Sequence, residues 1–372
     1  MSDQSHPAHT HLQHAFSRRE FLKTMGVVAA GALAASCSPN PATTKPTLAT
    51  ANPTVAIAQA ANYDPKLIRQ QVQSALDKIG GIADVLKHGN RAAIKVNVTG
   101  SKQMQQVNKL PEIETYHTHP EVVRVVGQLL RDAGITKLYL VEAVYAKEHW
   151  HDYGWDEVAK SLGATLVDLN DTAPYNDFAA TPVPGTSNIY DKFTLNHVLS
   201  DIDAFVSIPK MKCHNTCGVT HSVKNLVGLV PYRFYTVTEK DEYRSGFHGQ
   251  QSETATRLPS VIMDLNRARP VNLSIIDGVM TVEGGEGPWV KGLNPLKPGV
   301  LIAGKDPVAT DAVATAVMGF DPQAEFPNPP FVHAHNHLNM ARQLGLGTNV
   351  LNEIKVAGAA IADVRTPFKV SY

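Results

Sequence analysis

Residues 119–142 read HPEVVRVVGQLLRDAGITKLYLVE, a helix pattern that runs into a strand pattern. Pro120 falls in the first turn of the expected helix, where a residue without a backbone N–H is tolerated. Gly134 is a stop signal for that helix, and the short apolar segment Lys137–Glu142 then predicts a strand. Because a further strand is expected over residues 92–98, this part of the chain predicts a strand–helix–strand unit.

The same alternation continues toward the end of the chain. Further strands are expected over residues 164–169, 204–208, 272–277, 300–303 and 353–356, and helices over 65–86, 155–162, 258–267, 307–318 and 337–344. We therefore predict a three-layer α/β fold, in which a mostly parallel sheet carries helices on both faces and a single domain spans residues 63–372. Residues 170–188 and 232–256 are long and loop-rich, and such loops are often functional.

The composition is that of an ordinary globular protein. The chain has 372 residues, of which 43% are hydrophobic and 18% charged, enough for a sizeable core. Its 34 basic residues balance 34 acidic ones, so no overall field favours nucleic acid or an anionic membrane. The three cysteines (Cys37, Cys213 and Cys217) are too few for a scaffold built on disulfides.

The N-terminus carries an export signature. Residues 17–23, SRREFLK, match a twin-arginine motif, and the apolar run Met25–Ala35 behind them is too short to span a bilayer comfortably. We expect residues 1–37 to be a signal peptide of the twin-arginine route, which carries proteins that have already folded. The mature protein is expected to be periplasmic or otherwise extracytoplasmic.

A lipid anchor is the second expectation for this region. Residues 33–37, LAASC, resemble a lipoprotein cleavage site in which Cys37 becomes the acylated first residue, with simple cleavage near Ala35 or Ser36 as the alternative. Residues 38–62 are rich in Pro, Thr and Ala and predict an unstructured tether. Contact with a membrane is expected only through the lipid.

Residues 210–225, KMKCHNTCGVTHSVKN, gather lysines, cysteines and histidines directly after an expected strand. Cys213, Cys217 and His221 recur every four residues, so on a continuous helix they would form one stripe of metal ligands. This spacing differs from the usual C-x2-C knuckle, and a disulfide between the two cysteines would need Gly218 to break the helix. A polar loop with small core cysteines is the plain alternative.

The lysines of this stretch support a different interpretation. Lys210, Lys212 and Lys224 can hold an anion such as phosphate or carboxylate, and a helix start near residue 216 or 220 would add its N–H groups. His214 has an unperturbed pKa near neutrality and would serve as general acid and base. The residues alone leave the anion site and the metal site open.

A second histidine cluster follows a proline-rich segment. His333, His335 and His337 alternate along the chain, so in an extended segment they would share one face and chelate a divalent metal. A histidine-rich loop that touches metal only adventitiously is the alternative.

Polar residues also mark the ends of other expected strands, and in an open α/β sheet ligands bind beyond the carboxyl ends of the strands. These residues are Lys95, Asn97, Asp277 and Asp306. We expect them to converge with residues 210–225 at one edge of the sheet. The sequence lacks G-x-G-x-x-G, G-x-S-x-G and Walker motifs, which argues against a nicotinamide dehydrogenase, an α/β-hydrolase and a P-loop enzyme.

Several segments, in this order, resemble one family. They are AIKVN (93–97), THPE (118–121), PKMKCH (209–214), VKNLVG (223–228), IDG (276–278) with Glu283 and GP (287–288), DPVATD (306–311) and MGFDP (318–322). Together they resemble the domain-of-unknown-function family 362, some members of which are fused to iron–sulfur ferredoxin modules. The resemblance covers roughly residues 66–358.

The resemblance implies an α/β fold and a site, but no established reaction. The implied site residues are Lys95, Lys210, Lys212, His214, Lys224, Asn225, Asp277 and Asp306. Where the family usually has Lys-Thr-His this chain has Lys212-Cys-His214, and where it usually has Lys-Pro-Asn this chain has Lys95-Val-Asn97. Cys213 is thus no family-wide ligand, which weakens a metal site built on the cysteines. Because the chain has no ferredoxin-type cysteine run, an iron–sulfur cluster would belong to a partner.

The leading prediction is an exported enzyme with a Lys/His/Asp site for a small anionic substrate, metal-assisted and linked to a redox partner. The predicted catalytic residues are His214, Lys210, Lys212 and Asp277, and the predicted substrate-binding residues are Lys95, Asn97, Lys224, Asn225 and Asp306. The candidate ligands for a divalent metal cofactor are Cys213, Cys217, His221, His333, His335 and His337. A non-catalytic metal- or solute-binding protein, or an accessory protein of a redox partner, is the alternative.

Overall fold

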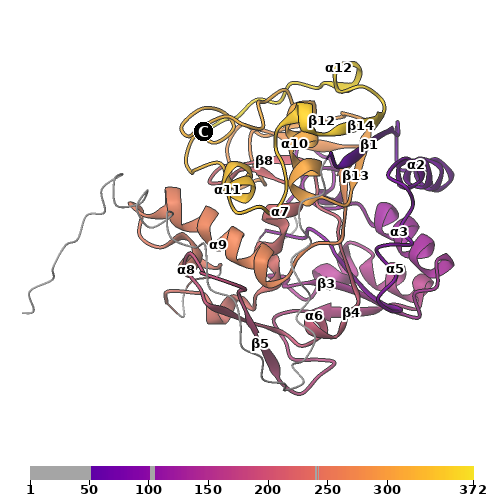
Figure 1. The fold of residues 1–372 in the computed structure, drawn as a ribbon, viewed down its shortest axis with the longest axis horizontal. Helices are drawn as coiled ribbons and strands as arrows, with labels where there is room; N and C mark the ends of the chain where they lie inside the picture. The colour runs from indigo at the N-terminus through magenta and orange to yellow at the C-terminus, as the bar shows by residue number, and fades with distance from the viewer. Residues whose placement is uncertain (1–51, 101–104, 239–240, 242) are drawn as a thin grey trace, which may run out of the picture. The chain divides into compact units, whose positions relative to one another are not determined.

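The computed structural model describes residues 52–100, 105–238, 241 and 243–372, which Figure 1 draws in colour. The predicted signal peptide, the acylation site Cys37 and the first part of the predicted tether lie outside these residues. Among the described residues, no helix combines the length and the apolar character that crossing a membrane requires.

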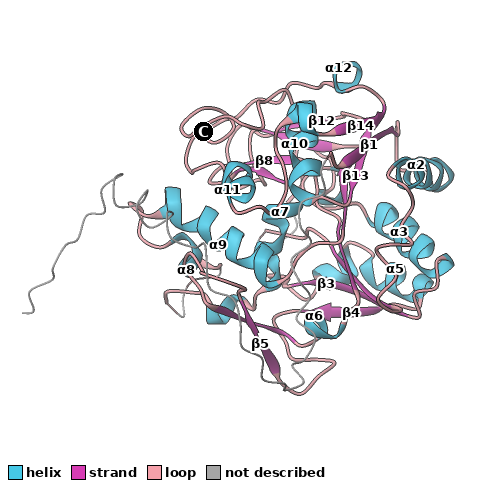
Figure 2. Ribbon diagram, in the orientation of Figure 1, coloured by secondary structure: helices cyan, strands magenta, loops and turns pink. Residues whose placement is uncertain are grey.

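An eight-stranded sheet runs through the described structure (Figure 2). Its strand order is β14 (Lys355–Gly358), β1 (Thr54–Gln59), β13 (Val300–Gly304), β10 (Leu273–Gly278), β7 (Ala204–Ser207), β2 (Arg91–Lys95), β3 (Lys137–Glu142) and β4 (Thr165–Asp168). Neighbouring strands are parallel except at β13, which runs antiparallel to both β1 and β10. The predicted mostly parallel sheet is therefore confirmed.

Helices cover both faces of this sheet (Figure 1). One face carries α2 (Pro65–Lys78), α3 (Pro120–Asp132), α4 (His149–Asp152) and α5 (Trp155–Leu162), and the other carries α7 (Ser222–Asn225), α9 (Thr254–Ala268), α10 (Pro307–Val317) and α11 (His337–Gln343). In β1, Val55 and Ile57 belong to the core beneath α10, whereas Ala56 and Ala58 belong to the core beneath α2. This alternation shows a sheet that is buried on both sides, as the prediction of three layers requires.

Short elements complete the described structure. They are the helices α6 (Val198–Asp201), α8 (Ser245–His248) and α12 (Ile361–Val364), and the 3-10 turns η1 (Glu112–Glu114), η2 (Leu226–Leu229), η3 (Tyr232–Phe234) and η4 (Leu351–Glu353). Three hairpins stand apart from the large sheet: β5 (Phe178–Pro182) with β6 (Lys192–Asn196), β8 (Lys212–His214) with β9 (Gly218–Thr220), and β11 (Thr281–Glu283) with β12 (Asn294–Leu296). The hairpins β8–β9 and β11–β12 follow the carboxyl ends of β7 and β10, where the site was expected.

Two boundaries differ from the sequence prediction. Helix α2 begins at Pro65, with the Asp64 side chain accepting N–H groups of its first turn, but it ends at Lys78 rather than at residue 86. Gly80 and Gly81 follow with φ values of +84° and +73°, and this left-handed backbone cannot continue a helix.

The predicted tether is too long at its C-terminal end. Residues 54–59, TVAIAQ, form β1, which pairs with β13 and β14 inside the sheet. The prediction gave weight to the prolines around this segment, whereas its consecutive apolar residues 55–58 form a strand buried on both faces. The domain therefore starts before residue 63.

Candidate functional site

The 210–225 stretch folds as the hairpin β8–β9 followed by the four-residue helix α7. The continuous helix on which the stripe of Cys213, Cys217 and His221 depended does not form, because Gly218 takes a φ of +78° and the chain turns back, so that Lys212 pairs with Thr220. Since side chains alternate between the two faces of a strand, Lys212 and His214 share one face and Cys213 points to the other.

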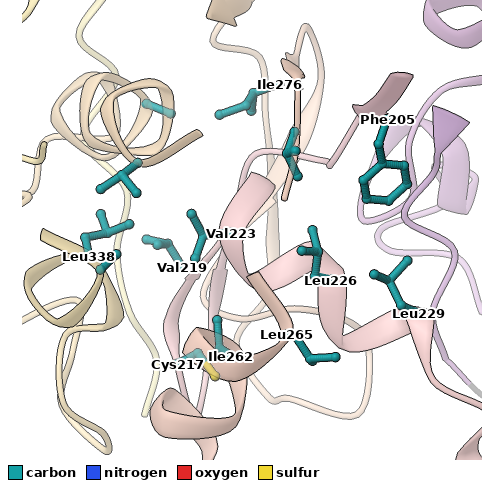
Figure 3. Packing of buried hydrophobic residues seen from close by; sticks show 14 of the residues in the cluster. Phe205, Cys217, Val219, Val223, Leu226, Leu229, Ile262, Leu265, Ile276 and Leu338 are labelled. Atoms are coloured by element: carbon teal, nitrogen blue, oxygen red, sulfur yellow. The ribbon is translucent and has the colours of Figure 1, made fainter. Parts of the chain in front are cut away.

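Cys213 and Cys217 are free thiols in the hydrophobic core, not a disulfide. Both are fully buried, and Figure 3 shows Cys217 in the same core as Val219 and Ile262. Burial raises the pKa of Cys217 to about 12 and also raises the pKa of Cys213. Neutral buried thiols of this kind are inert, so the plain alternative of small core residues fits both cysteines.

The histidines named as metal ligands are not brought together. His221 lies in the core with its Nε2 3.2 Å from the Sδ of Met318. His333 and His335 are exposed, whereas His337 is fully buried because the extended alternation ends where α11 begins. Within the described ranges, no three His, Cys, Asp or Glu side chains are placed to hold a metal ion. The predicted ligand sets therefore form no metal centre in this part of the chain.

Lys210 and Asp277 form an ion pair that is fully buried in the protein. The Nζ of Lys210 lies 2.7 Å from the Oδ2 of Asp277, and both side chains are 0% exposed. The Tyr63 hydroxyl at 3.0 Å and the carbonyls of Ile113 and Met280 at 3.1 Å surround the same ammonium. With every N–H direction taken by the protein, Lys210 has no donor left for a ligand.

Lys95 and Asn225 are also buried together, at the carboxyl ends of β2 and β3. The Nζ of Lys95 donates to Oε2 of Glu142 at 2.7 Å and to the Val96 carbonyl at 2.7 Å, and lies 3.4 Å from the Oδ1 of Asn225. Burial lowers the pKa of Lys95 to about 8, although Glu142 opposes the shift. Their position at the strand ends agrees with the prediction, but neither residue lines the pocket described below.

Asp306 lies at the opposite edge of the sheet from these residues. Because β13 is antiparallel, its carboxyl end pairs with the start of β10, where Gly304 faces Ser274. Asp306 accepts the N–H of Ala309 at 2.9 Å as the N-cap of α10, and it lines a separate pocket of about 410 Å³. The expected convergence of Asp306 with the lysines is wrong, since the prediction assumed that this strand pointed the same way as its neighbours.

The N-terminus of α7 is occupied by the protein itself. The two carboxylate oxygens of Asp311 accept the N–H groups of Ser222 and Val223, each at 2.8 Å. Asp311 is fully buried, so the protein's own carboxylate stands where the sequence placed an external anion.

A pocket of about 430 Å³ lies at the carboxyl ends of β2 and β3. Its walls come from the segments after these two strands, the hairpin β8–β9, α7, α8 and the loop between β11 and β12. This is the edge at which open α/β sheets bind ligands, and the volume falls within the roughly 300–1,000 Å³ of small-molecule sites. The pocket is therefore the candidate functional site.

Three cationic side chains line the pocket: Lys212, Lys224 and Arg244. Among the described lining residues, Glu286 is the one carboxylate. Arg244 is buried and donates to the Val230 carbonyl at 2.9 Å and to the Tyr145 hydroxyl at 3.0 Å, and no carboxylate among the described residues pairs with its charge. The pocket thus has more side chains that can carry a positive charge than carboxylates.

The two lysines differ in how they are held. The Nζ of Lys212 donates to the carbonyls of Tyr116 at 2.6 Å and Glu286 at 2.9 Å. The Nζ of Lys224 makes no hydrogen bond and no ion pair with any described residue. Burial lowers the pKa of both ammonium groups, that of Lys212 well below its usual value. An anion entering the pocket would favour their charged forms.

His214 lies on the pocket face of the hairpin. Its Nδ1 accepts the N–H groups of Thr216 at 3.2 Å and Cys217 at 3.3 Å, so the ring proton is on Nε2. Burial, followed by the charge of Lys224, lowers the pKa of His214 well below its usual value. The ring is therefore neutral in the protein without a ligand.

Glu286 is ionised in the same pocket. Burial alone would raise its pKa, but the Asn215 N–H at 2.7 Å helps to lower the value to about 2. The indole N–H of Trp289 at 2.9 Å contributes in the same direction. The hydrogen bonds from Asn215 and Trp289 therefore stabilise the ionised carboxylate of Glu286.

Two buried polar atoms of the pocket have no hydrogen-bond partner in the part of the chain that the structure describes. They are the Oδ1 of Asn97, in a residue 8% exposed, and the Oγ1 of Thr220, in a residue 1% exposed. Buried polar atoms normally form hydrogen bonds, so both atoms fit a polar ligand in the pocket.

Arg244, His248 and Trp289 were missed by reasoning from the sequence. Arg244 and His248 fall in the long loop-rich stretch 232–256, and its length was the available signal. Nothing in the sequence near Trp289 separates a pocket residue from an ordinary surface aromatic.

Comparison with known proteins gives three findings. A profile of the family described as Domain of unknown function (DUF362) matches residues 92–316, which include all the lining residues of the 430 Å³ pocket. A thylakoid-associated protein of Synechocystis is 25% identical over 270 residues, which is 72% of this chain and 75% of the relative. The lactate racemase apoprotein of Thermoanaerobacterium thermosaccharolyticum superposes with a TM-score of 0.36 and 11% identity over 66% of this chain, which spans only 54% of that protein. The chain belongs to the DUF362 family.

Proposed function

We propose that this protein is an enzyme that binds a small anionic molecule in the 430 Å³ pocket. The observation that supports this most is the charge of the lining, where Lys212, Lys224 and Arg244 face one carboxylate. Two unit charges 4 Å apart near a protein surface interact by about 4 kcal/mol. The pocket should thus favour an anion over a neutral molecule of the same shape.

His214 is the group we assign to proton transfer. Its neutral ring is a base in the absence of a ligand, and a bound anion would raise its pKa, so that it can accept a proton and return it. Lys212 and Lys224 would hold the negative charge that develops during such a step. Lys210 and Asp277, which are sealed from the pocket, are positioning residues in this proposal rather than catalytic ones.

Four further parts of the proposal come from the sequence. They are export by the twin-arginine route, a lipid at Cys37, a divalent metal and a redox partner. The thylakoid-associated relative supports a place of action beside a membrane. Replacing Cys37 by Ala should move the protein from the membrane fraction to the soluble periplasmic fraction. The metal content of protein that was folded in the cytoplasm and then purified tests whether it binds a divalent metal.

The test of the anion site is calorimetric titration with inorganic phosphate. The Lys224→Met variant is expected to bind at least about tenfold more weakly than the wild type, the loss of roughly 1.4 kcal/mol of attraction. Lys355→Met, which removes an exposed lysine of β14, is the matched control and should bind like the wild type. Equal affinities for wild type and Lys224→Met would show that the pocket is not the anion site.

Catalysis is separated from simple solute binding by His214→Gln. A mixture of small organic anions is incubated with each protein and followed by mass spectrometry. We expect turnover with the wild type, and with His214→Gln retained binding but no turnover. Binding by the wild type without any turnover would favour a solute-binding protein.

A further inference from the structure

Trp289 stands at the rim of the pocket with a large part of its indole exposed. It lines the pocket and is 47% exposed, an unusual position for the largest apolar side chain. Its orientation is nonetheless fixed, because the indole N–H donates to Oε1 of Glu286 and its ring packs edge-on to Tyr116 at a centroid distance of 5.9 Å.

Two glycines leave the space that the indole ring occupies. A Cβ on Gly287 would lie 2.3 Å from the indole, and a Cβ on Gly100 would lie 3.1 Å from it. Both positions therefore need glycine, or a side-chain shift, to leave the indole where it is. A flat surface held in this way is ready for stacking without a further loss of side-chain entropy.

The apolar lining continues beside Trp289. Phe247 and Leu258 are buried pocket residues, and Val227 is partly exposed. Tyr243, at 51% exposure, is a second exposed aromatic ring of the lining. The pocket thus combines a cationic part with an aromatic and apolar part, and an inorganic oxyanion would use only the first.

We propose that the ligand is a small organic anion that carries a planar ring, with its charged group at Lys212, Lys224 and Arg244 and its ring against Trp289. This rests on the proposed function, since it names the class of molecule that the same site binds. A volume of about 430 Å³ has room for a single ring with a carboxylate or phosphate group. A planar π-face stacked on an aromatic side chain is expected to raise affinity about tenfold.

The experiment compares each charged group with and without a ring. Phosphate is titrated against phenyl phosphate, and acetate against benzoate, with the wild type, Trp289→Ala and Lys224→Met. We expect the ring to raise affinity about tenfold in the wild type, and less than threefold in Trp289→Ala. Inorganic phosphate should bind to Trp289→Ala within about twofold of the wild type. Phe234→Ala is the matched control, because Phe234 is 46% exposed and lies outside the pocket lining.

The outcomes separate this inference from the proposed function. If phosphate binds through Lys224 but the ring adds nothing, the anion site stands and the ring is excluded. A ring effect that persists in Trp289→Ala would also overturn the inference, since the ring would then rest elsewhere. If neither phosphate nor acetate nor their ring-bearing counterparts bind, the proposed function itself fails. If the ring raises affinity more for phosphate than for acetate, phosphate is the preferred charged group, and the reverse result identifies carboxylate.

Discussion

At the scale of single residues, the site contains two kinds of buried cation. Lys210 and Lys95 are each paired with a carboxylate at 2.7 Å and do not line the pocket. Lys224 and Arg244 line the pocket and have no carboxylate partner within ion-pair distance among the described residues. Removing one member of a sealed pair leaves a buried charge uncompensated, whereas removing a pocket cation removes attraction for a ligand.

Lys210→Met is therefore expected to affect stability and not ligand affinity. It should lower the free energy of unfolding by about 3–5 kcal/mol, because Asp277 would remain buried without its partner. The double variant Lys210→Met with Asp277→Leu should recover a large part of that loss. Denaturant titration measures both, and phosphate affinity of the folded single variant should stay within about twofold. A stable variant with lost affinity would place Lys210 in the binding site instead.

Ligand binding is expected to take up protons. Burial lowers the pKa of Lys212, Lys224 and His214 in the free protein, and a bound anion should raise them again. A higher pKa in the complex means that affinity increases as the pH falls through the interval between the free and bound values. Sulfate is a suitable ligand because it does not titrate in this range.

The measurement is calorimetry of sulfate binding in two buffers with different ionisation enthalpies, at about pH 6 and about pH 8. Tighter binding at the lower pH, with heats that depend on the buffer, is the expected result. Lys224→Met should reduce the number of protons taken up. Identical heats in both buffers at both pH values would contradict a site whose basic side chains have lowered pKa values in the free protein.

At the scale of elements, the hairpin β8–β9 positions the pocket side chains. It stands where the metal-stripe interpretation needed a continuous helix, because the left-handed φ of Gly218 reverses the chain between His214 and Thr220. A Cβ at position 218 would also lie 2.5 Å from the ring of Phe331. The turn therefore has both a backbone and a packing requirement for glycine.

Gly218→Ala is expected to cost more stability than an ordinary left-handed glycine. The left-handed backbone alone costs an L-residue about 1–2 kcal/mol, and the contact with Phe331 should add at least about 1 kcal/mol. Gly345→Ala is the matched control, because its φ is +70° but a Cβ there meets nothing within 4 Å. Denaturant titration compares the two variants, and equal losses would show that the contact with Phe331 is unimportant.

The elements also show what the residue pattern can and cannot predict. Alternation and helix stop signals placed β3 and β7 nearly to the residue, since these depend on local sequence. The direction of β13 depends on its neighbours in the sheet, so Asp306 was assigned to the wrong edge. A repeat of four residues fits a helix or a turn of a hairpin, and only the tertiary packing around Cys217 and Gly218 decides between them.

At the scale of the whole molecule, the fold buries several histidines in neutral form. Burial lowers the pKa of six described histidines: His117, His119, His214, His221, His248 and His337. Between the pKa of each buried histidine in the folded protein and about pH 6.5, the unfolded chain binds more protons than the folded one. Stability should therefore fall as the pH drops below about 6.5.

His221 isolates one of these contributions. It is 0% exposed, and burial lowers its pKa to about 3. Between about pH 6.5 and pH 5, the wild type should lose on average about 1 kcal/mol per pH unit more than His221→Leu does, and the difference approaches about 1.4 kcal/mol per pH unit at the acidic end. The exposed His333→Leu is the control and should keep the slope of the wild type. Equal slopes for the wild type and His221→Leu in urea titrations would refute this source of acid lability.

The whole molecule gathers residues that the sequence places far apart. Asn97, Lys212 and His214 were predicted from the ends of strands, Lys224 was predicted from the lysines of residues 210–225, and all four line one pocket. Arg244 and Trp289 complete the pocket from loops whose paths no local pattern determines. The fold class and the centre of the site were thus accessible from the sequence, and the outer wall was not.

The most direct test of the anion site is a crystal structure of the protein grown with selenate, whose position anomalous scattering locates. The account predicts a selenate ion within hydrogen-bonding distance of the Lys224 ammonium, inside the pocket formed by β8–β9, α7 and α8. A selenate ion bound instead beside Lys305 in the 410 Å³ pocket, with the 430 Å³ pocket empty at saturating selenate, would contradict it.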